Sequence, residues 1–304
     1  MIVDTQFLAG VRTTFKAVFD QVMGAAPSDW TKFVTVIDTG GKTKLTFNWL
    51  GAPPMMRAMG DTLIFGKAFP HDYTITATEN GVGIEISEQT FMNDPLGTIT
   101  LFVKNLMVQA AKYEMKIAAE TLSDGFSVAG FDSTKYFYSA THYFGDSAAH
   151  NNLSATNLGT DGVIYQTAWQ TINTAPDDAG VAMALVPDLL VVPPAYRTVA
   201  RRLLQAEFIG LDTSNTSISN VNKGDCEYIT TPYLKTTKEW HLLATNSMEP
   251  KPVIFAEQMP KRFVAQDGLD AEDAFNRNVY KYKVDNKIAT GYGDPRAAYG
   301  STGT

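Results

Sequence analysis

The sequence predicts an α+β protein, and three observations support that class. Extended runs fill residues 31–88, a long amphipathic helix follows over residues 95–123, and short strands return between residues 226 and 284. Alternating apolar residues bounded by Gly, Pro and Asn are typical of strands, whereas apolar residues three and four apart are typical of a helix. Strands that gather in blocks around a long helix indicate an α+β chain.

Composition narrows the classes of function. The chain has 304 residues, enough for one large or two closely packed domains, and 44% of them are apolar. A net charge of -7 argues against nucleic-acid binding through the overall field of the protein. The single Cys226 excludes an intramolecular disulfide and any site with several cysteines. No run of eighteen apolar residues and no signal-peptide pattern occurs, so no membrane segment is predicted.

The N-terminal third is predicted to combine an amphipathic arm with two hairpins. Apolar residues at helical spacing between Leu8 and Val22 predict a helix within residues 1–30. Two extended runs flank Gly40 and Gly41, which favours a hairpin turn there, and a second hairpin is expected across Asn80 and Gly81. The intervening GAPPMMRAMGD is expected to form a short helical turn.

The long helix begins after Asp94, whose side chain is suited to cap it, and Pro95 suits its first turn. From residue 95 to 123 it would run about 43 Å at 1.5 Å per residue. An irregular, Ser- and Asn-rich stretch is expected over residues 126–160, followed by a helix at about 161–174.

The segment LLVVPPAYRTVARRLL predicts a buried strand followed by a helix. A polar loop, LDTSNTSISNVNKGD, comes next and is expected to be exposed. The remaining strands are expected in CEYIT, WHLLAT, KPVIFAEQ and NVYKYKV.

Candidate chemical sites are weak. His142, Asp146 and His150 would align as metal ligands on a helix, but Gly145 and the Ser-rich context disfavour that helix, so no metal is predicted. Cys226 and His241 would be a nucleophile and base only if the fold brought them together, and a free Cys is more often a small buried apolar residue.

Three further motifs have simpler structural explanations. Gly81-Val82-Gly83 and Gly291-Tyr292-Gly293 lack the additional Gly or Lys of a phosphate loop, so turns are the expected role. The alternating Tyr and Lys residues of NVYKYKVDNKI suit an amphipathic strand better than a nucleic-acid surface. Prolines at the start of the helix after residue 192 remove amide donors, so its arginines do not form an anion site there. The sequence therefore predicts no enzyme and no cofactor.

The order of several segments resembles the Mu-type major head subunit family of tailed-phage capsid proteins. They run from APSDWTKFVTVI and WLGAPPMMRAMGD through HDYTITATENGVGIEISEQTFMNDPLGTI and LVPDLLVVPPAYRTVARRLL to GYGDPRAAYGSTG, nearly the whole chain. The resemblance implies the Hong Kong 97-type capsid fold. Its expected parts are an N-terminal arm (1–30), an extended loop with the first peripheral-domain strands (31–94), a spine helix (95–125), an axial domain (126–248), and the returning peripheral strands with the C-terminus (249–304).

The resemblance also implies a function. The chain is expected to be a major capsid protein that assembles into pentamers and hexamers of an icosahedral shell around double-stranded DNA, without sequence-specific DNA binding. Expected partners are other copies of the chain, a separate scaffolding protein, a portal and a decoration protein, and the expected location is the virion after assembly in the bacterial cytoplasm. Candidate subunit-contact residues are Phe15, Phe19, Lys42, Lys44, Arg57, Lys67, Arg197, Arg201 and Arg202.

Three alternatives remain open from the sequence alone. An encapsulin-like nanocompartment shell would have the same fold with a different content. A hydrolase would use Cys226 or the cluster around His142, and a phage tail or adhesin protein would suit the many strands. No motif near Lys42, Lys44 or Lys67 predicts a covalent crosslink between subunits.

Overall fold

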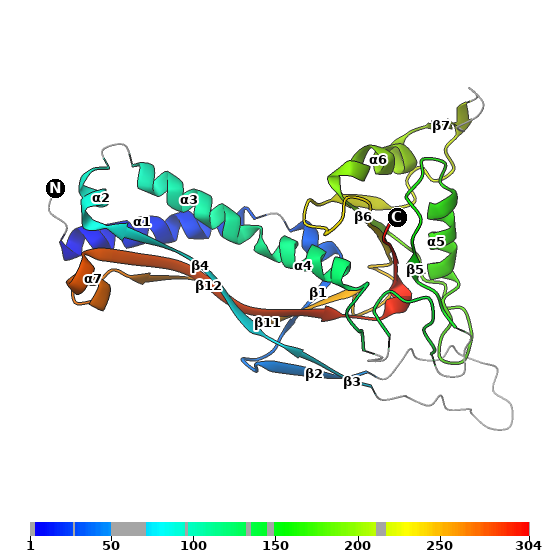
Figure 1. Cartoon of the computed structure of the whole chain (residues 1–304), viewed down its shortest axis with the longest axis horizontal. Coiled ribbons are helices and arrows are strands. Elements are labelled where there is room, and N and C mark those ends of the chain that lie inside the picture. Colours follow the sequence, from blue (N-terminus) through cyan, green and yellow to red (C-terminus); the bar gives the residue numbers. More distant parts are fainter. Residues whose placement is uncertain are drawn as a thin grey trace.

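The computed structural model divides into an elongated part and a broader part (Figure 1). The N-terminal helix begins at the far end of the elongated part, and the C-terminus lies within the broader part. Both parts combine sheet and helix, as an α+β chain requires. The structure describes residues 4–26, 28–49, 71–94, 97–131, 135–144, 149–210 and 217–303.

A four-stranded sheet runs the length of the elongated part, with strand order β1-β11-β12-β4. β1 lies parallel to β11, and the other neighbours are antiparallel. On β12 the side chains of Tyr280 and Tyr282 are buried, while Lys281 and Lys283 lie on the opposite face. The predicted amphipathic strand is therefore confirmed. The strands are β1 (Val34–Asp38), β4 (Thr78–Ser87), β11 (Val253–Gln266) and β12 (Val279–Tyr292).

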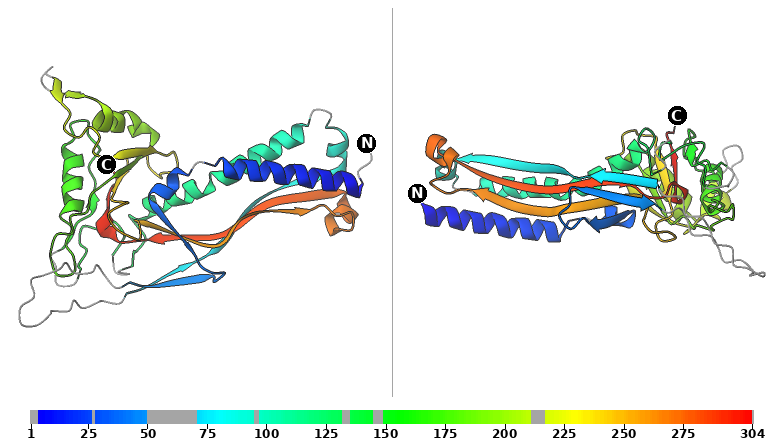
Figure 2. Two further views of the ribbon diagram at one scale, coloured as in Figure 1. Left: turned by 180° about the vertical axis from the view of Figure 1, so that it is seen from behind. Right: turned by 90° about the horizontal axis from the view of Figure 1, so that it is seen from below.

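Helices cover one face of this sheet (Figures 1 and 2), and Ile75, Phe131 and Phe144 bury the opposite face where β11 begins. The arm helix is confirmed, and its buried side chains, which include Leu8 and Val22, join a core formed with β4, β12 and the long helix. The helices of this part are α1 (Thr5–Gly24), α2 (Glu88–Met92), α3 (Thr98–Ala111), α4 (Tyr113–Asp124) and α7 (Glu272–Arg277).

The long helix differs from the prediction in two respects. It begins at Thr98 and not at residue 95, and it is divided at Lys112 into α3 and α4. The Lys112 amide is shared between the carbonyl groups of Val108 and Gln109, at 3.3 and 3.2 Å. Such sharing tightens the helix locally and changes its direction. Gly97 and not Asp94 is the residue before the helix, but Asp94 still accepts hydrogen bonds from the first amides of α3, those of Thr98 and Ile99.

Both predicted hairpins are wrong in their pairing. Gly40 and Gly41 do form a turn with positive φ, but that turn leads from β1 into a separate two-stranded ribbon of β2 (Lys44–Trp49) and β3 (His71–Thr76). Asn80 and Gly81 lie inside β4, opposite Asn286 and Asp285 of β12. Pairing with a strand two hundred residues away overrides the local turn preference, and the predicted helical turn between the ribbon strands lies outside the described residues.

The broader part is built on a five-stranded sheet with strand order β5-β13-β10-β6-β9. β6, β10 and β13 are buried along their whole length, since α5 and α6 and the irregular segments cover the sheet. Its elements are β5 (Leu153–Ser154), α5 (Val163–Asn173), β6 (Leu189–Val192), α6 (Arg197–Gln205), β9 (Glu227–Thr230), β10 (Trp240–Leu243) and β13 (Ala298–Ser301). Three short 3-10 turns, η1 (Asp29–Lys32), η2 (Pro194–Tyr196) and η3 (Pro295–Ala297), complete the fold.

The C-terminal segment, predicted to hold returning strands and the C-terminus, crosses from the elongated part to the broader part. β11 and β12 lie in the elongated part, but β13 pairs with β10 and β5 in the five-stranded sheet. A buried ion pair marks the crossing, because Arg296 donates to Asp294 at 2.6 Å and to Asp178 at 3.0 Å, with Arg296 and Asp294 both fully buried. The chain end therefore joins the two parts.

The polar loop at 211–225 is only partly exposed in the described structure. Residues 217–219 form β8 (Ser217–Ser219), which pairs with β7 (Phe208–Gly210). Asn220 is buried and donates to the carbonyl groups of Leu203 and Ala206, so it satisfies the C-terminal end of α6. Polar composition here serves helix capping as well as solvent contact.

Candidate assembly surfaces

The residues considered for metal binding form a buried structural pair. His142 and His150 face each other in an antiparallel bridge, with backbone N–H to O distances of 2.9 and 2.8 Å, so the four-residue helical alignment is absent. Burial, together with the nearby charges of His142 and Arg296, lowers the pKa of His150 to about 4. Asp146 lies outside the described residues, and the described ones contain no group of three side chains suited to hold a metal ion.

Cys226 and His241 do not form a catalytic pair. The Cys226 thiol contacts the Tyr165 hydroxyl at 3.4 Å, and burial raises its pKa to about 12, so the thiol stays protonated at neutral pH. His241 on β10 shares a hydrogen bond of 2.9 Å with the Tyr138 hydroxyl, and burial lowers the pKa of His241 to about 3. Each residue packs into a different core.

The glycine pairs are neither phosphate loops nor turns. Gly291 and Gly293 are held where a Cβ atom would lie 2.4 Å from Ile75 and 2.3 Å from the Lys251 carbonyl oxygen, so close packing requires glycine. Gly81 and Gly83 lie within β4, where the nearest atoms to a Cβ would be 3.4 and 3.2 Å away. Internal packing therefore explains the glycines at positions 291 and 293 better than those at positions 81 and 83.

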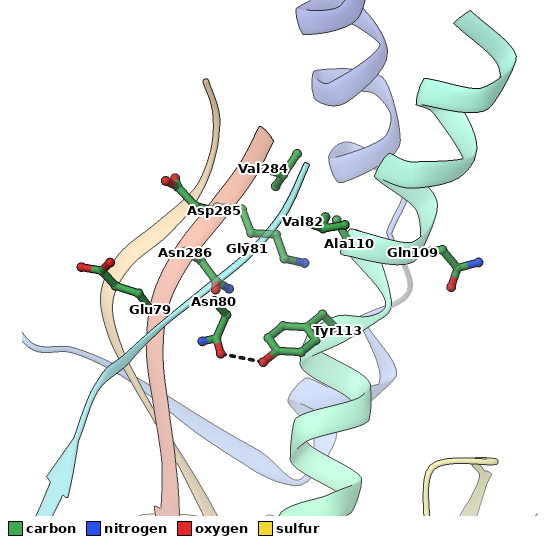
Figure 3. Close-up of a pocket in the computed structure, with 11 residues that line it drawn as sticks. Glu79, Asn80, Gly81, Val82, Gln109, Ala110, Tyr113, Val284, Asp285 and Asn286 are labelled. Atoms are coloured by element: carbon green, nitrogen blue, oxygen red, sulfur yellow. Dashed lines mark hydrogen bonds between the residues drawn. The ribbon is translucent and has the colours of Figure 1, made fainter. Parts of the chain in front are cut away.

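A groove between α3 and β4 was not anticipated from the sequence. It has a volume of about 490 Å³ and is lined by side chains of β4, α3, α4 and β12 (Figure 3). The Tyr113 hydroxyl donates to Asn80 Oδ1 at 2.7 Å across it. Asn286, 4% exposed, lines its floor and makes no side-chain hydrogen bond within the described part of the chain. The only sequence signal was glycine inside a strand.

Phe15 and Phe19 of the arm, both predicted subunit contacts, pack on the sheet of their own chain. Phe15 packs edge-on against Tyr282 with 4.9 Å between ring centroids, and Phe19 lies beside Phe263 at 6.3 Å. Both are buried against the chain's own sheet, so they hold the arm on its own subunit. The helix is also held by an ion pair between Arg12 and Asp267, which the sequence did not indicate.

The β2–β3 ribbon carries Lys42 and Lys44, both exposed. Its base is fixed on the large sheet, because Tyr73 accepts a hydrogen bond from the Tyr292 amide at 3.2 Å and Ile75 is buried against β11. The ribbon projects from the body of the elongated part (Figure 1). Arg57 and Lys67, the other predicted contact residues of this region, lie outside the described residues.

Comparison with known proteins identifies the family. A sequence model of a family described as phage capsid protein matches residues 72–301, about three quarters of the chain and strands of both sheets. The chain belongs to the phage capsid protein family. No helix in the described structure is long and apolar enough to cross a membrane.

Two curated relatives agree with this capsid family and with the Mu-type resemblance. The Mu-like prophage FluMu major head subunit of Haemophilus influenzae is 26% identical over 159 residues, which cover 51% of each protein. The major capsid protein of Escherichia phage Mu is 23% identical over 137 residues, covering 45% of each. The chain spans about half the length of these relatives.

Solved capsid structures show the fold. The procapsid of bacteriophage JBD30 matches with a TM-score of 0.57 and 18% identity, covering 99% of this chain and 76% of that one. The JBD30 capsid matches with a TM-score of 0.58 and 15% identity, covering 77% of this chain and 100% of that one. A virus-like particle from Pyrococcus furiosus matches with a TM-score of 0.51 and 10% identity, covering 94% of this chain and 96% of that one. These likenesses confirm the expected Hong Kong 97-type capsid fold, while the family assignment rests on sequence.

In a capsid family member the sites of interest are subunit contacts, and the outer face of α6 is one candidate. Arg197, Arg201 and Arg202 are exposed there and form no ion pair with the described part of the chain. The opposite face of α6 buries Ala200 and Leu203 in the core of the broader part. The helix is thus fixed on its inner side, and its three cations face outward.

Proposed function

We propose that this chain is the major capsid protein of a tailed-phage head and assembles into pentamers and hexamers of a closed icosahedral shell. The observation that carries the proposal is the phage capsid family match over residues 72–301. In this proposal the elongated part is the peripheral domain, with α3 and α4 as the divided spine, and the part built on the five-stranded sheet is the axial domain.

The proposed mechanism is repeated burial of modest contacts. Apolar area removed from water contributes about 25 cal/mol per Å². Rings and closed shells repeat each heterologous contact around a symmetry axis, so small contributions add over many copies. The ribbon with Lys42 and Lys44, and the arginines of α6, are the surfaces proposed to meet neighbouring subunits, because they are exposed while their elements are anchored internally.

The proposed content is double-stranded DNA that the shell encloses without sequence-specific contacts. The net charge of -7 supports this, because strong binding to phosphates needs concentrated cations. The proposal expects weak, salt-sensitive binding of the free subunit to duplex DNA. Binding that persists at high salt would contradict it. Further proposed partners are a separate scaffolding protein, a portal and a decoration protein, with assembly in the bacterial cytoplasm before incorporation in the virion.

Electron microscopy of the overexpressed protein tests the function, with and without a co-expressed scaffolding protein. The expected result is closed shells or free capsomers, whereas only monomers, tubes or fibres would overturn the proposal. A charge-reversed variant, Arg201→Glu with Arg202→Glu, is expected to fold normally yet to form far fewer capsomers. Lys223→Glu, a single reversal at another exposed cation, serves as its control.

A nanocompartment shell is the second candidate, favoured only by the fold likeness to the virus-like particle from Pyrococcus furiosus. The content of purified particles separates the two. DNA packaged in the presence of portal and terminase supports the phage head, whereas particles that enclose an enzyme and exclude DNA support the alternative.

A further inference from the structure

The bridge formed by His142 and His150 is fixed to the elongated part. Two backbone hydrogen bonds close the bridge, and both imidazole side chains are buried. Phe144, two residues after His142, joins a core cluster with Ile75 of β3 and Ile254 of β11. Its ring lies nearly parallel to that of His142, at 12° and with 5.8 Å between centroids. One side of the bridge therefore packs on the base of the β2–β3 ribbon and on the long sheet.

The same bridge is fixed to the broader part through η3, which follows the end of β12 (Figure 1). Asn152 donates to the Pro295 carbonyl group at 3.0 Å, and its own carbonyl group accepts from the Gly300 amide of β13 at 2.9 Å. The Arg296 guanidinium lies 4.1 Å from the centre of the Phe144 ring. Contacts between a cation and an aromatic ring are strongest where water is excluded. The bridge therefore ties η3 and β13 to the elongated part.

The charges around His150 disfavour a further cation at the bridge. Arg296 of η3 and His142 across the bridge both oppose a positive charge on the His150 ring. Asp294 favours one, but its carboxylate already accepts from Nε and Nη2 of Arg296. Asp178 accepts from Nη1 of the same guanidinium at 3.0 Å. Both carboxylates are therefore committed to Arg296, and neither is free to stabilise a protonated His150.

A proton on His150 would also lack a hydrogen-bond acceptor. The Nε2 atom of His150 is buried and makes no hydrogen bond within the described part of the chain. A neutral imidazole suits this position beside the Phe144 ring, with 6.2 Å between centroids. An imidazolium has two N–H donors, and a buried charged donor without an acceptor is strongly destabilising. Protonation therefore becomes favourable only when the ring reaches water.

We propose that the bridge between His142 and His150 is an acid-sensitive switch at the junction of the two parts. Protonation of His150 opens the bridge, withdraws Phe144 from the base of the ribbon and separates Asn152 from η3. The closed bridge fixes the ribbon and the long sheet relative to the broader part, and the open bridge removes that restraint. The switch lies within one copy of the chain, so it goes beyond the proposed function and does not depend on it.

The pH range of the switch follows from the surroundings of the ring. Burial, together with His142 and Arg296, holds the pKa of His150 at about 4 in the closed bridge, against about 6.5 for a histidine in water. Because the closed state has the lower pKa, it keeps its full stability above pH ~6.5 and loses stability as the pH falls toward 4. Proton linkage between these two values raises the ratio of open to closed bridges about twentyfold between pH 7 and pH 5.

Amide hydrogen exchange of the whole chain tests the switch, because it measures local opening directly. Peptides that contain residues 139–144 or 149–153 are compared at pH 7 and pH 5, after correction for the chemical rate of exchange at each pH. The expected result is exchange about twenty times faster at pH 5 in these peptides, with no change in peptides of β12. Exchange that follows the chemical rate alone in the bridge peptides would overturn the proposal.

Two substitutions of similar length separate charge from size at the same position. His150→Lys places a positive charge at the bridge and is expected to give fast exchange already at pH 7. His150→Met fills the site without a charge and should keep slow exchange at both pH values. As a control, Tyr143→Lys adds the same charge on a neighbouring side chain that is 66% exposed, and should exchange slowly at pH 7. Equal exchange in the two His150 variants would show that size and not charge opens the bridge, which would contradict the switch.

Discussion

The two sheets of this protein show two ways of using strands. β12 in the elongated part alternates from residue 279 to 288, with Tyr282 buried on one face and Lys283 in an ion pair on the other. β6 and β10 in the broader part are buried throughout. Along this stretch of β12 helices cover one face of the sheet, and the charged side chains of Lys281 and Lys283 lie on the other. The five-stranded sheet is covered on both faces, so each polar group within it must find a partner in the interior.

That difference predicts where a lost arginine matters most. Arg296→Leu leaves Asp294 charged and fully buried, and removal of one partner of a buried pair costs about 3–5 kcal/mol. The free energy of unfolding from chemical denaturation measures the loss. Arg262→Leu is the matched variant, because Arg262 is exposed and Asp285 retains Lys283, so its cost should stay below about 1 kcal/mol. Equal losses in the free energy of unfolding for the two variants would show that an ion pair matters no more in the broader part than on the elongated sheet.

The docking of α1 predicts the next largest effect. Phe15 is 2% exposed and packs against Tyr282, so Phe15→Ala should cost about 3 kcal/mol or more of the free energy that holds the helix on the sheet. Faster hydrogen exchange at the amides of α1 would report it. Phe102→Ala removes the same ring from an exposed site and should leave exchange in α1 unchanged. Unaltered exchange in the Phe15 variant would contradict the internal role assigned to the arm helix.

Local patterns predicted much of the fold. The apolar spacing between Leu8 and Val22 identified α1, and Asp94 indicated the start of the long helix to within a few residues, because both signals are local. Strand positions on β12 followed from its alternation. The spacing put Phe15 on the apolar face of the arm but did not identify the surface it packs against, since a periodicity says nothing about the partner.

Pairing between segments far apart in the sequence explains why some predicted strand arrangements were wrong. Asn80 and Gly81 have the composition of a hairpin turn, yet they extend β4 through pairing with Asn286 and Asp285. Short segments likewise do not reveal that β13 leaves the elongated sheet for the other one. The groove combines Asn80, Tyr113 and Asn286, which only the three-dimensional fold brings together. Assembly surfaces depend on such combinations, so sequence reasoning reached the family before it reached the contacts.

The buried imidazoles predict a pH dependence centred on the broader part. The pKa is lowered to about 4 for His150 and about 3 for His241, below the unfolded value of about 6.5. Below pH ~6.5 the unfolded state binds more protons than the folded state. The free energy of unfolding therefore keeps its full value above pH ~6.5 and decreases as the pH falls toward the pKa values of the folded state. For each histidine, the free energy of unfolding changes by at most about 1.4 kcal/mol per pH unit.

Denaturation between pH 7 and 5, where carboxylates titrate little, measures this slope. His150→Gln should reduce it, because glutamine cannot take up the proton that the unfolded histidine binds. As the pH falls, amide hydrogen exchange should become faster around β10 and β13 and stay unchanged in β12. A slope identical in the wild type and the variant would show that His150 is not responsible.

The charged face of the elongated sheet predicts the smallest effect. Lys287 and Glu79 lie directly opposite each other on β12 and β4, with 3.5 Å between their charged atoms, but the Glu79 side chain is 80% exposed. Water screens such pairs, so a double-mutant cycle with Lys287→Met and Glu79→Gln should give a coupling below about 1 kcal/mol. In ~1 M salt, where the screening length falls to about 3 Å, the coupling should vanish. A coupling energy above about 2 kcal/mol would mean that this exposed pair contributes as much as a buried ion pair and would contradict the difference between the two sheets.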